Sequence, residues 1–166
     1  MPELSLIVAY SKNRVIGKDS KIPWNIPGEQ DRFKMLTTGN VVIMGRHTFD
    51  EIFKKFNRPL ANRFTLVISS IRDYSEYGCP TFCSLPDALK FAREKFSDKN
   101  IYIAGGERLY KEAIPLVDKM YITKVELEVE GDAFFPQFDE AEFTVTEEKK
   151  INANIPYTYF TYERKK

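Results

Sequence analysis

Short runs of apolar, β-branched and aromatic residues recur along the chain and predict strands. The early runs are almost continuously apolar, which is typical of strands buried on both faces of a parallel sheet. The runs are LSLIVAY (4–10), VVIMG (41–45), FTLVISS (64–70), NIYIAGG (100–106), KMYITKVELEV (119–129), FTVTEEKK (143–150) and PYTYFTYE (156–163).

Segments of helical periodicity separate these strands in the first two-thirds of the chain. One helix has Pro27 in its first turn and stops at Gly39, and another follows Ser84, with Asp87 three residues later as in a capping box. The expected helices span about 27–38, 47–56, 85–97 and 107–114.

Strands that alternate with amphipathic helices predict an α/β fold, with a mostly parallel sheet covered by helices on both faces. The final strands have no helix between them, so we expect them to pair antiparallel. Two of the helices carry apolar stripes that predict faces packed in the core: Phe49, Ile52, Phe53 and Phe56 on one, and Leu85, Ala88, Leu89, Ala92 and Phe96 on the other.

The composition is that of a globular protein. The 166 residues are 43% hydrophobic and 30% charged, which suits a single domain over 1–166 with one sizeable core. No apolar run approaches the ~18 residues of a membrane span, and a net charge of +1 gives no overall field to attract nucleic acid. The first residues lack the basic region and cleavage signature of a signal peptide. We therefore expect a cytoplasmic protein with neither membrane nor nucleic acid as a partner.

The chain contains few of the residues that ligate transition metals. His47 is the only histidine, and Cys79 and Cys83 are the only cysteines, whereas a zinc ribbon needs about four closely spaced ligands. We expect no metal centre. The spacing CPTFC is compatible with a redox pair, but ordinary reduced thiols are the favoured interpretation.

Residues that could bind a phosphate first appear where the strand VVIM ends. Gly45 allows a close approach of the backbone, and Arg46, His47 and Thr48 add two possible cations and a hydroxyl at a helix start, which suits a phosphate. A tight turn with a surface arginine and a capping threonine would look the same if this segment stood alone.

Two further strands end in residues that can receive an anion. IYIA runs into Gly105-Gly106 and then a helix, although this is not the GxGxxG fingerprint because Glu107 follows. FTLVI ends in Ser69 and Ser70 with Arg72 close behind, residues that can bind a phosphate but that taken alone also fit a polar turn. Ligands of α/β sheets bind outside the carboxyl ends of the strands, so three such exits together favour a dinucleotide.

One acidic residue lies at a helix start beside an unusual segment. Glu29 precedes Phe33 by four residues and Leu36 by seven, so it shares their apolar face, and Trp24, the only tryptophan, lies just before the helix. The helix dipole alone favours an acid in a first turn. The periodicity nevertheless predicts a buried carboxyl group, with the raised pKa that burial gives, as a candidate catalytic acid.

Several segments together resemble the dihydrofolate reductase family in order and spacing over essentially the whole chain. They are LSLIVAYSKNRVIGKDSKIPW, PGEQDRFK, VVIMGRHTF, NRPLANR, IYIAGGERLY, MYITKV and EGDAFFP. The resemblance implies an eight-stranded mixed sheet, NADPH as the cofactor, and reduction of 7,8-dihydrofolate by hydride transfer with protonation of the neighbouring ring nitrogen. It also implies inhibition by antifolates such as methotrexate.

The resemblance assigns roles to individual residues. Glu29 would anchor the pterin, supported by Thr123, with Trp24 closing the pocket through a water, and Asp132 would lie in a loop packed on Gly17. The substrate-binding residues would be Ile7, Val8, Ile22, Glu29, Gln30, Phe33, Ile52, Leu60, Arg63 and Thr123, of which Arg63 would pair with the tail carboxylate. The cofactor-binding residues would be Ala9, Ile16, Gly17, Gly45, Arg46, His47, Thr48, Ser69, Ser70, Ala104, Gly105, Gly106, Glu107, Arg108, Leu109 and Tyr110.

The chain departs from the family pattern at a few positions. Residues 53–56 form an extra stretch expected to lengthen the helix after Ile52, and Glu107 follows the glycines. Gln30 stands at a usually apolar rim position, which resembles reductases that tolerate trimethoprim, although an ordinary half-exposed helix position would look the same. A monomer is expected. Two other functions remain open: a pyrimidine reductase of riboflavin synthesis, which would not need Trp24 with Glu29, and a nucleotide-binding module without catalysis.

Overall fold

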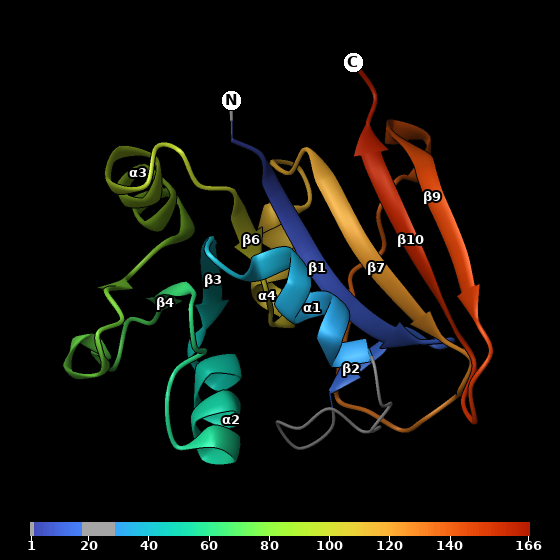
Figure 1. Cartoon of the computed structure of the whole chain (residues 1–166), viewed down its shortest axis with the longest axis horizontal. Coiled ribbons are helices and arrows are strands. Elements are labelled where there is room, and N and C mark those ends of the chain that lie inside the picture. Colours follow the sequence, from blue (N-terminus) through green and yellow to red (C-terminus); the bar gives the residue numbers. More distant parts are fainter. Residues whose placement is uncertain (1, 18–28) are drawn as a thin grey trace.

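The fold is built on one eight-stranded sheet, seen in a computed structural model that describes residues 2–17 and 29–166 (Figure 1). The strand order is β5-β4-β3-β6-β1-β7-β10-β9. Strand β10 runs antiparallel to both of its neighbours, and the other pairs between adjacent strands are parallel. This confirms the predicted mixed sheet. The strands are β1 (Leu4–Ser11), β3 (Val41–Gly45), β4 (Phe64–Ile68), β5 (Thr81–Phe82), β6 (Ile101–Ile103), β7 (Lys119–Val125), β9 (Phe143–Ile151) and β10 (Tyr157–Arg164).

Helices cover both faces of the sheet, as predicted. In Figure 1 α1 lies in front of the sheet and α4 behind it. Leu6 and Val8 of β1 lie in one buried cluster with residues of α3 and α4, whereas Val42 and Met44 of β3 pack with Phe49 of α2 in another. Successive side chains of a strand point to opposite faces, so β3 and β4 contribute residues to both clusters. The helices are α1 (Glu29–Thr37), α2 (Arg46–Phe56), α3 (Leu85–Lys95) and α4 (Glu107–Ala113), and 3₁₀ turns lie at Ser75–Tyr77 and Glu140–Glu142.

The ends of the helices follow local sequence signals. Ser84 caps α3, because its hydroxyl accepts a hydrogen bond from the backbone N–H of Asp87 at 3.3 Å. Helix α2 extends through the extra stretch 53–56 and is capped by Asn57, which adopts the left-handed conformation with φ 57°. The predicted core stripe of α2 is wrong at its last member, since Phe56 is 45% exposed, because α2 has by then passed the edge of the core.

Three short strands were not predicted, since two or three residues carry no periodicity of their own. Besides β5, they are β2 (Val15–Gly17) and β8 (Ala133–Phe134), which pair antiparallel and are called the β2–β8 ribbon below. The backbone N–H of Asp132 donates to the carbonyl of Gly17 at 3.0 Å, so the expected contact of the Asp132 loop with Gly17 is confirmed.

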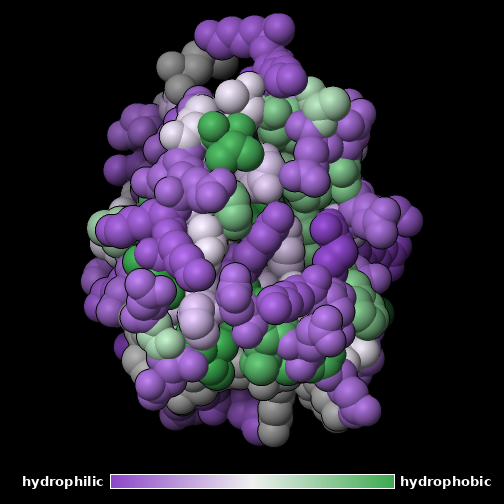
Figure 2. Space-filling model, turned by 90° about the vertical axis from the view of Figure 1, so that its right-hand side faces the viewer, coloured by the Kyte–Doolittle hydropathy of each residue, from purple (hydrophilic) through white to green (hydrophobic). Residues whose placement is uncertain are grey.

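The outer edge of the sheet is polar. Residues 147–150 of β9, EEKK in the sequence, are all exposed, as expected for a solvated strand edge. Figure 2 shows that the side of the molecule that carries β9 and β10 is mainly hydrophilic. Charged side chains on an edge strand oppose pairing with another chain. Among the described residues, no helix has the length and apolarity needed to cross a membrane.

An aromatic cluster lies under the β2–β8 ribbon. Phe135 is 2% exposed, and its ring centroid lies 5.2 Å from that of Tyr10 and 5.3 Å from that of Tyr110. The guanidinium of Arg14 lies over the rings of Tyr10 and Phe135, 5.3 and 5.7 Å from their centroids. The residue that follows β8 therefore fastens the ribbon to the core.

This packing predicts very different costs for truncating two adjacent phenylalanines. Phe135→Ala should lower the free energy of unfolding by about 3–5 kcal/mol, because it empties a closed aromatic site. The control Phe134→Ala, at a side chain that is 42% exposed, should change it by less than about 0.5 kcal/mol. Urea unfolding of both variants measures the difference, and equal losses would contradict the packing described.

Candidate active site

The predicted strand exits of β3 and β6 meet at one edge of the sheet. These strands are parallel neighbours, and the backbone N–H of Gly45 donates to the carbonyl of Gly105 at 2.8 Å. A Cβ atom on Gly45 would lie 3.6 Å from that carbonyl oxygen. The structure thus brings together two glycine segments that are 60 residues apart in the sequence.

The glycine turn after β6 leaves bare backbone beside Thr48. Gly105 has φ +115°, which disfavours any side chain, and a Cβ there would lie 3.2 Å from the hydroxyl of Tyr110 and 3.4 Å from that of Thr48. The peptide between Gly105 and Gly106 is cis. The distances from these glycines place the hydroxyl of Thr48 at the same turn, as a phosphate cradle requires.

Two basic groups begin α2 beside this turn. Arg46 Nη2 lies 3.3 Å from His47 Nε2, and Arg46 Nη1 lies 3.9 Å from Asp50. No side chain caps the helix, and its first turn holds no acid, so its first N–H groups receive no hydrogen bond from a side-chain cap. His47 is exposed and Arg46 half-buried. This arrangement fits the phosphates of a dinucleotide.

The exit of β4 supplies a polar turn. The hydroxyl of Ser69 accepts hydrogen bonds from the backbone N–H groups of Ile71 and Arg72 at 3.3 and 3.1 Å, which is the geometry of the polar-turn alternative. Ser70 is exposed. Arg72 lies 4.0 Å from the carboxylate of Asp50, so its charge adjoins that of Arg46. Arg72 lies close behind the two serines, as noted in the sequence, although it is not among the cofactor-binding residues that the resemblance assigns.

The predicted cofactor residues on helix α4 differ in burial. Leu109 and Tyr110 are each 5% exposed, and the Tyr110 hydroxyl donates to the carbonyl of Ile7 at 2.8 Å. Arg108 is exposed. Glu107 Oε1 accepts a hydrogen bond from the backbone N–H of Phe134 at 2.6 Å. Leu109 and Tyr110 therefore support the glycine turn from the core.

On the proposed substrate side, β1 and β7 place Thr123 beside Ala9. The two residues pair in register, and Thr123 is 3% exposed. Ile7 and Ala9 point to the opposite face of the sheet from Leu6 and Val8, so Val8 lies in the core behind the site. Ala104, after β6, is half-buried and packs against the cluster of Phe49.

Apolar residues from α1, α2 and the following loop converge on the Phe49 cluster. Phe33, Ile52 and Leu60 all pack against it while remaining partly exposed, as expected for walls of a binding site. Gln30 is exposed, which suits the rim position predicted for it. Ile16 and Gly17 lie on β2 in the ribbon.

Arg63 is held by α1. Its Nη1 donates to the hydroxyl of Thr37 at 3.3 Å, and that hydroxyl donates to the carbonyl of Phe33 at 2.7 Å. Burial, and secondarily the positive charge of Arg58, lower the pKa of the Arg63 guanidinium. Its Nε atom is buried and has no hydrogen-bond partner within the described part of the chain. An incoming carboxylate would supply both the missing partner and the missing charge.

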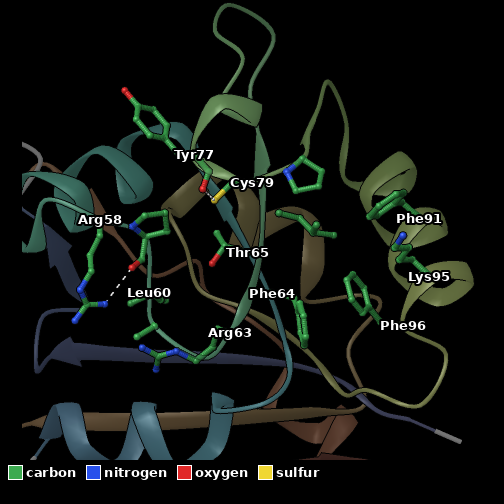
Figure 3. Close-up of a pocket in the computed structure, with 15 residues that line it drawn as sticks. Arg58, Leu60, Arg63, Phe64, Thr65, Tyr77, Cys79, Phe91, Lys95 and Phe96 are labelled. Atoms are coloured by element: carbon green, nitrogen blue, oxygen red, sulfur yellow. Dashed lines mark hydrogen bonds between the residues drawn. The ribbon is translucent and has the colours of Figure 1, made fainter.

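A pocket of about 570 Å³ adjoins Leu60 and Arg63 along the outer side of β4. Figure 3 shows Arg58 and Arg63 at one end of it, Lys95 and Phe96 at the other, and Thr65 between them. Three of its lining side chains are basic and none is acidic. Sequence reasoning did not single out Arg58 or Lys95, because they lie on separate segments that only the tertiary fold brings together.

Three predicted site residues are not placed. Trp24 and Ile22 lie outside the described residues, and of Glu29 the structure describes only that it begins α1, not its side chain. Its predicted burial therefore stays a prediction.

Comparison with known proteins agrees with this architecture. The family model described as dihydrofolate reductase matches residues 3–164. The chain is 41% identical to dihydrofolate reductase type A13 of Escherichia coli, over 96% of this chain and 93% of that protein. It is 37% identical to dihydrofolate reductase of Bacillus subtilis, over 98% and 95% of the two chains.

A solved structure shows the same fold. Dihydrofolate reductase from Enterococcus faecalis, complexed with NADP(H) and the compound RAB-propyl, superposes with a TM-score of 0.87 at 32% identity, covering 99% of this chain and 97% of that one. The family match, the identities over nearly the full length and the shared fold agree with the glycine turns and basic groups at the strand exits, and the chain belongs to the dihydrofolate reductase family.

Proposed function

We propose that the chain carries out the reaction of its family, with Glu29 at the start of α1 holding the pterin and the cofactor lying across the carboxyl ends of β3, β4 and β6. In this reaction NADPH gives a hydride to the pterin ring of 7,8-dihydrofolate, the neighbouring ring nitrogen takes a proton, and tetrahydrofolate and NADP⁺ result. The family model spans 3–164, which supports a single reductase domain over 1–166.

The contact of Gly45 with Gly105 is the observation that carries this proposal. It gives two strand exits a common surface of bare backbone, flanked by Thr48, Arg46 and His47. A 2′-phosphate on the adenine ribose needs cations and hydroxyls, and the residues proposed to contact it are Arg46, His47 and Ser70, where an NAD enzyme would present an acid. These residues fit NADPH better than NADH.

Different residues of the chain bind the substrate, hold the proton and exclude water. The bound cofactor supplies the hydride, while Glu29 orients the ring and holds the proton near its nitrogen, directly or through water. Ile7, Phe33, Ile52 and Leu60 form apolar walls that exclude water, and Thr123 supports Glu29 from β7. Arg63 pairs with the tail carboxylate.

The direct test is oxidation of NADPH with dihydrofolate as the acceptor, followed with the purified protein. Turnover that methotrexate inhibits tightly would exclude the pyrimidine reductase of riboflavin synthesis. Binding of NADPH without binding of dihydrofolate would instead support the nucleotide-binding module.

We also propose a monomer in the cytoplasm that binds no nucleic acid. The exposed charges of residues 147–150 on the edge strand β9 oppose pairing of sheets between chains. The net charge of +1 gives no general attraction for a polyanion. Sedimentation at micromolar concentration tests the oligomeric state.

Removing the proposed acid should nearly abolish turnover. Glu29→Ala should lower kcat/KM for dihydrofolate at least a hundredfold, which corresponds to about 2.7 kcal/mol of transition-state stabilisation. The matched control is Asp31→Ala, an exposed acid on the same helix, which should retain wild-type rates. Unchanged turnover in Glu29→Ala would remove Glu29 from the mechanism.

Truncating Arg46 should affect the two nicotinamide cofactors differently. Arg46→Ala should raise KM for NADPH about tenfold, because a charge-assisted hydrogen bond to phosphate is lost, and should hardly change KM for NADH. Arg93→Ala, at an exposed arginine of α3, serves as the control for charge alone. Equal effects on KM for both cofactors would show that Arg46 does not contact the 2′-phosphate.

Replacing Arg63 by lysine should weaken substrate binding without slowing the chemistry. Lysine lacks the planar fork that pairs with a carboxylate, so KM for dihydrofolate should rise about 10- to 100-fold with kcat nearly unchanged. A substrate analogue that ends before the glutamate provides the control, since it should react equally well with both proteins. If the analogue also loses affinity, Arg63 does not bind the tail.

A further inference from the structure

Glu107 joins two segments that both belong to the proposed cofactor site. It is the first residue of α4, directly after the Gly105-Gly106 turn. Its Oε1 accepts the backbone N–H of Phe134 in β8 at 2.6 Å, a short contact typical of a charged acceptor. The two residues are 27 positions apart, so this is a tertiary contact.

On one side of this contact, Phe134 belongs to the β2–β8 ribbon. The pairs Val15 with Phe134 and Gly17 with Ala133 hold β8 against β2. The backbone N–H of Phe135 donates to the carbonyl of Arg14 at 2.8 Å. Because β8 is paired with β2, a contact that holds β8 also helps to fix Ile16 and Gly17, in addition to the packing of Ile16 against the core.

On the other side of the contact, α4 is fixed to the glycine turn and to the core. The N–H of Tyr110 donates to the carbonyl of Gly106 at 2.9 Å, and the Tyr110 hydroxyl donates to Ile7 of β1 at 2.8 Å. Glu107 therefore extends from a rigid element, and the β2–β8 ribbon is the smaller partner that it holds.

An acid at this position has a cost that needs an explanation. A carboxylate beside the glycine turn repels the phosphates of a dinucleotide. A first-turn acid is favoured by the helix dipole, but that preference requires no particular hydrogen-bond partner. Neither the repulsion of phosphates nor the helix dipole accounts for the short hydrogen bond between Glu107 and the N–H of Phe134.

We propose that Glu107 is a positioning residue of the cofactor site, which holds the β2–β8 ribbon in register with the glycine turn. This inference rests on the proposed placement of the cofactor, with its phosphates at Gly105 and Gly106 and its nicotinamide end near Ile16 and Gly17. The hydrogen bond orders the two ends of the site before the cofactor arrives, so less ordering remains to oppose binding.

The test compares two substitutions that remove the same charge. Glu107→Gln keeps an oxygen that can accept the N–H of Phe134, whereas Glu107→Ala keeps none. The dissociation constant for NADPH should be about three- to tenfold higher in Glu107→Ala than in Glu107→Gln, the range expected for one neutral hydrogen bond. The affinity for dihydrofolate should be the same in both. Glu112→Ala, at an exposed acid of the same helix, should bind NADPH like the wild type.

Amide hydrogen exchange of the ligand-free protein tests the contact independently of function. Exchange at Phe134 should be faster in Glu107→Ala than in the wild type and should be restored in Glu107→Gln. Unchanged exchange at Phe134 in Glu107→Ala would overturn the contact itself. Faster exchange with equal NADPH affinity of the two variants would overturn the positioning role.

A third result would also refute the inference. If both variants bind NADPH equally and more tightly than the wild type, Glu107 acts only through its charge. The Arg46→Ala experiment tests the proposed cofactor site without involving Glu107. If Arg46→Ala affects NADPH and NADH equally, the proposed cofactor placement is wrong; if only the Glu107 variants behave unexpectedly, the proposed role of Glu107 is wrong.

Discussion

The close approach of the ends of β3 and β6 is the constraint on which the rest of the site depends. A parallel sheet brings adjacent carboxyl ends together, but side chains normally keep the loops beyond those ends apart. Here the Gly45 N–H reaches the Gly105 carbonyl at 2.8 Å, and a Cβ on Gly105, at φ +115°, would lie tightly against Tyr110 at 3.2 Å and Thr48 at 3.4 Å. The two helix starts that follow these glycines, those of α2 and α4, therefore lie close to each other. A dinucleotide can then contact backbone from both strands at once.

The same region connects the two halves of the proposed site. Tyr110 packs beneath the glycine turn, and its hydroxyl donates to the carbonyl of Ile7, a residue of the proposed substrate site on β1. Phe135 packs its ring against Tyr110 and holds the ribbon from below. A shift of α4 would therefore move the glycine turn, β1 and the ribbon together. Preorganisation of this kind is what a hydride transfer between two bound molecules requires.

Much of the fold could be predicted from local pattern, because long apolar runs and capped amphipathic helices carry their own signals. All seven predicted strands and all four helices are present. The features that could not be predicted depend on partners distant in sequence. The strands β2 and β8 exist because they pair with each other, Phe56 is exposed because α2 ends beyond the core, and the direction of Glu107 is set by Phe134. Of the predicted site, the glycine turns are placed, whereas Trp24 and the side chain of Glu29 lie outside the described residues.

The electrostatics of the site show why net charge is a poor guide to ligand binding. With +1 overall, the chain has no general field for anions, yet five of its basic side chains lie in two groups. Arg46 and Arg72 share Asp50 near the glycine turn, while Arg58, Arg63 and Lys95 line the β4 pocket, where no acid balances them. These are the two places where the proposed ligands carry negative charge, the cofactor phosphates and the tail carboxylate. Burial, and secondarily the positive charge of Arg58, lower the pKa of Arg63, and a bound carboxylate would stabilise its charged form.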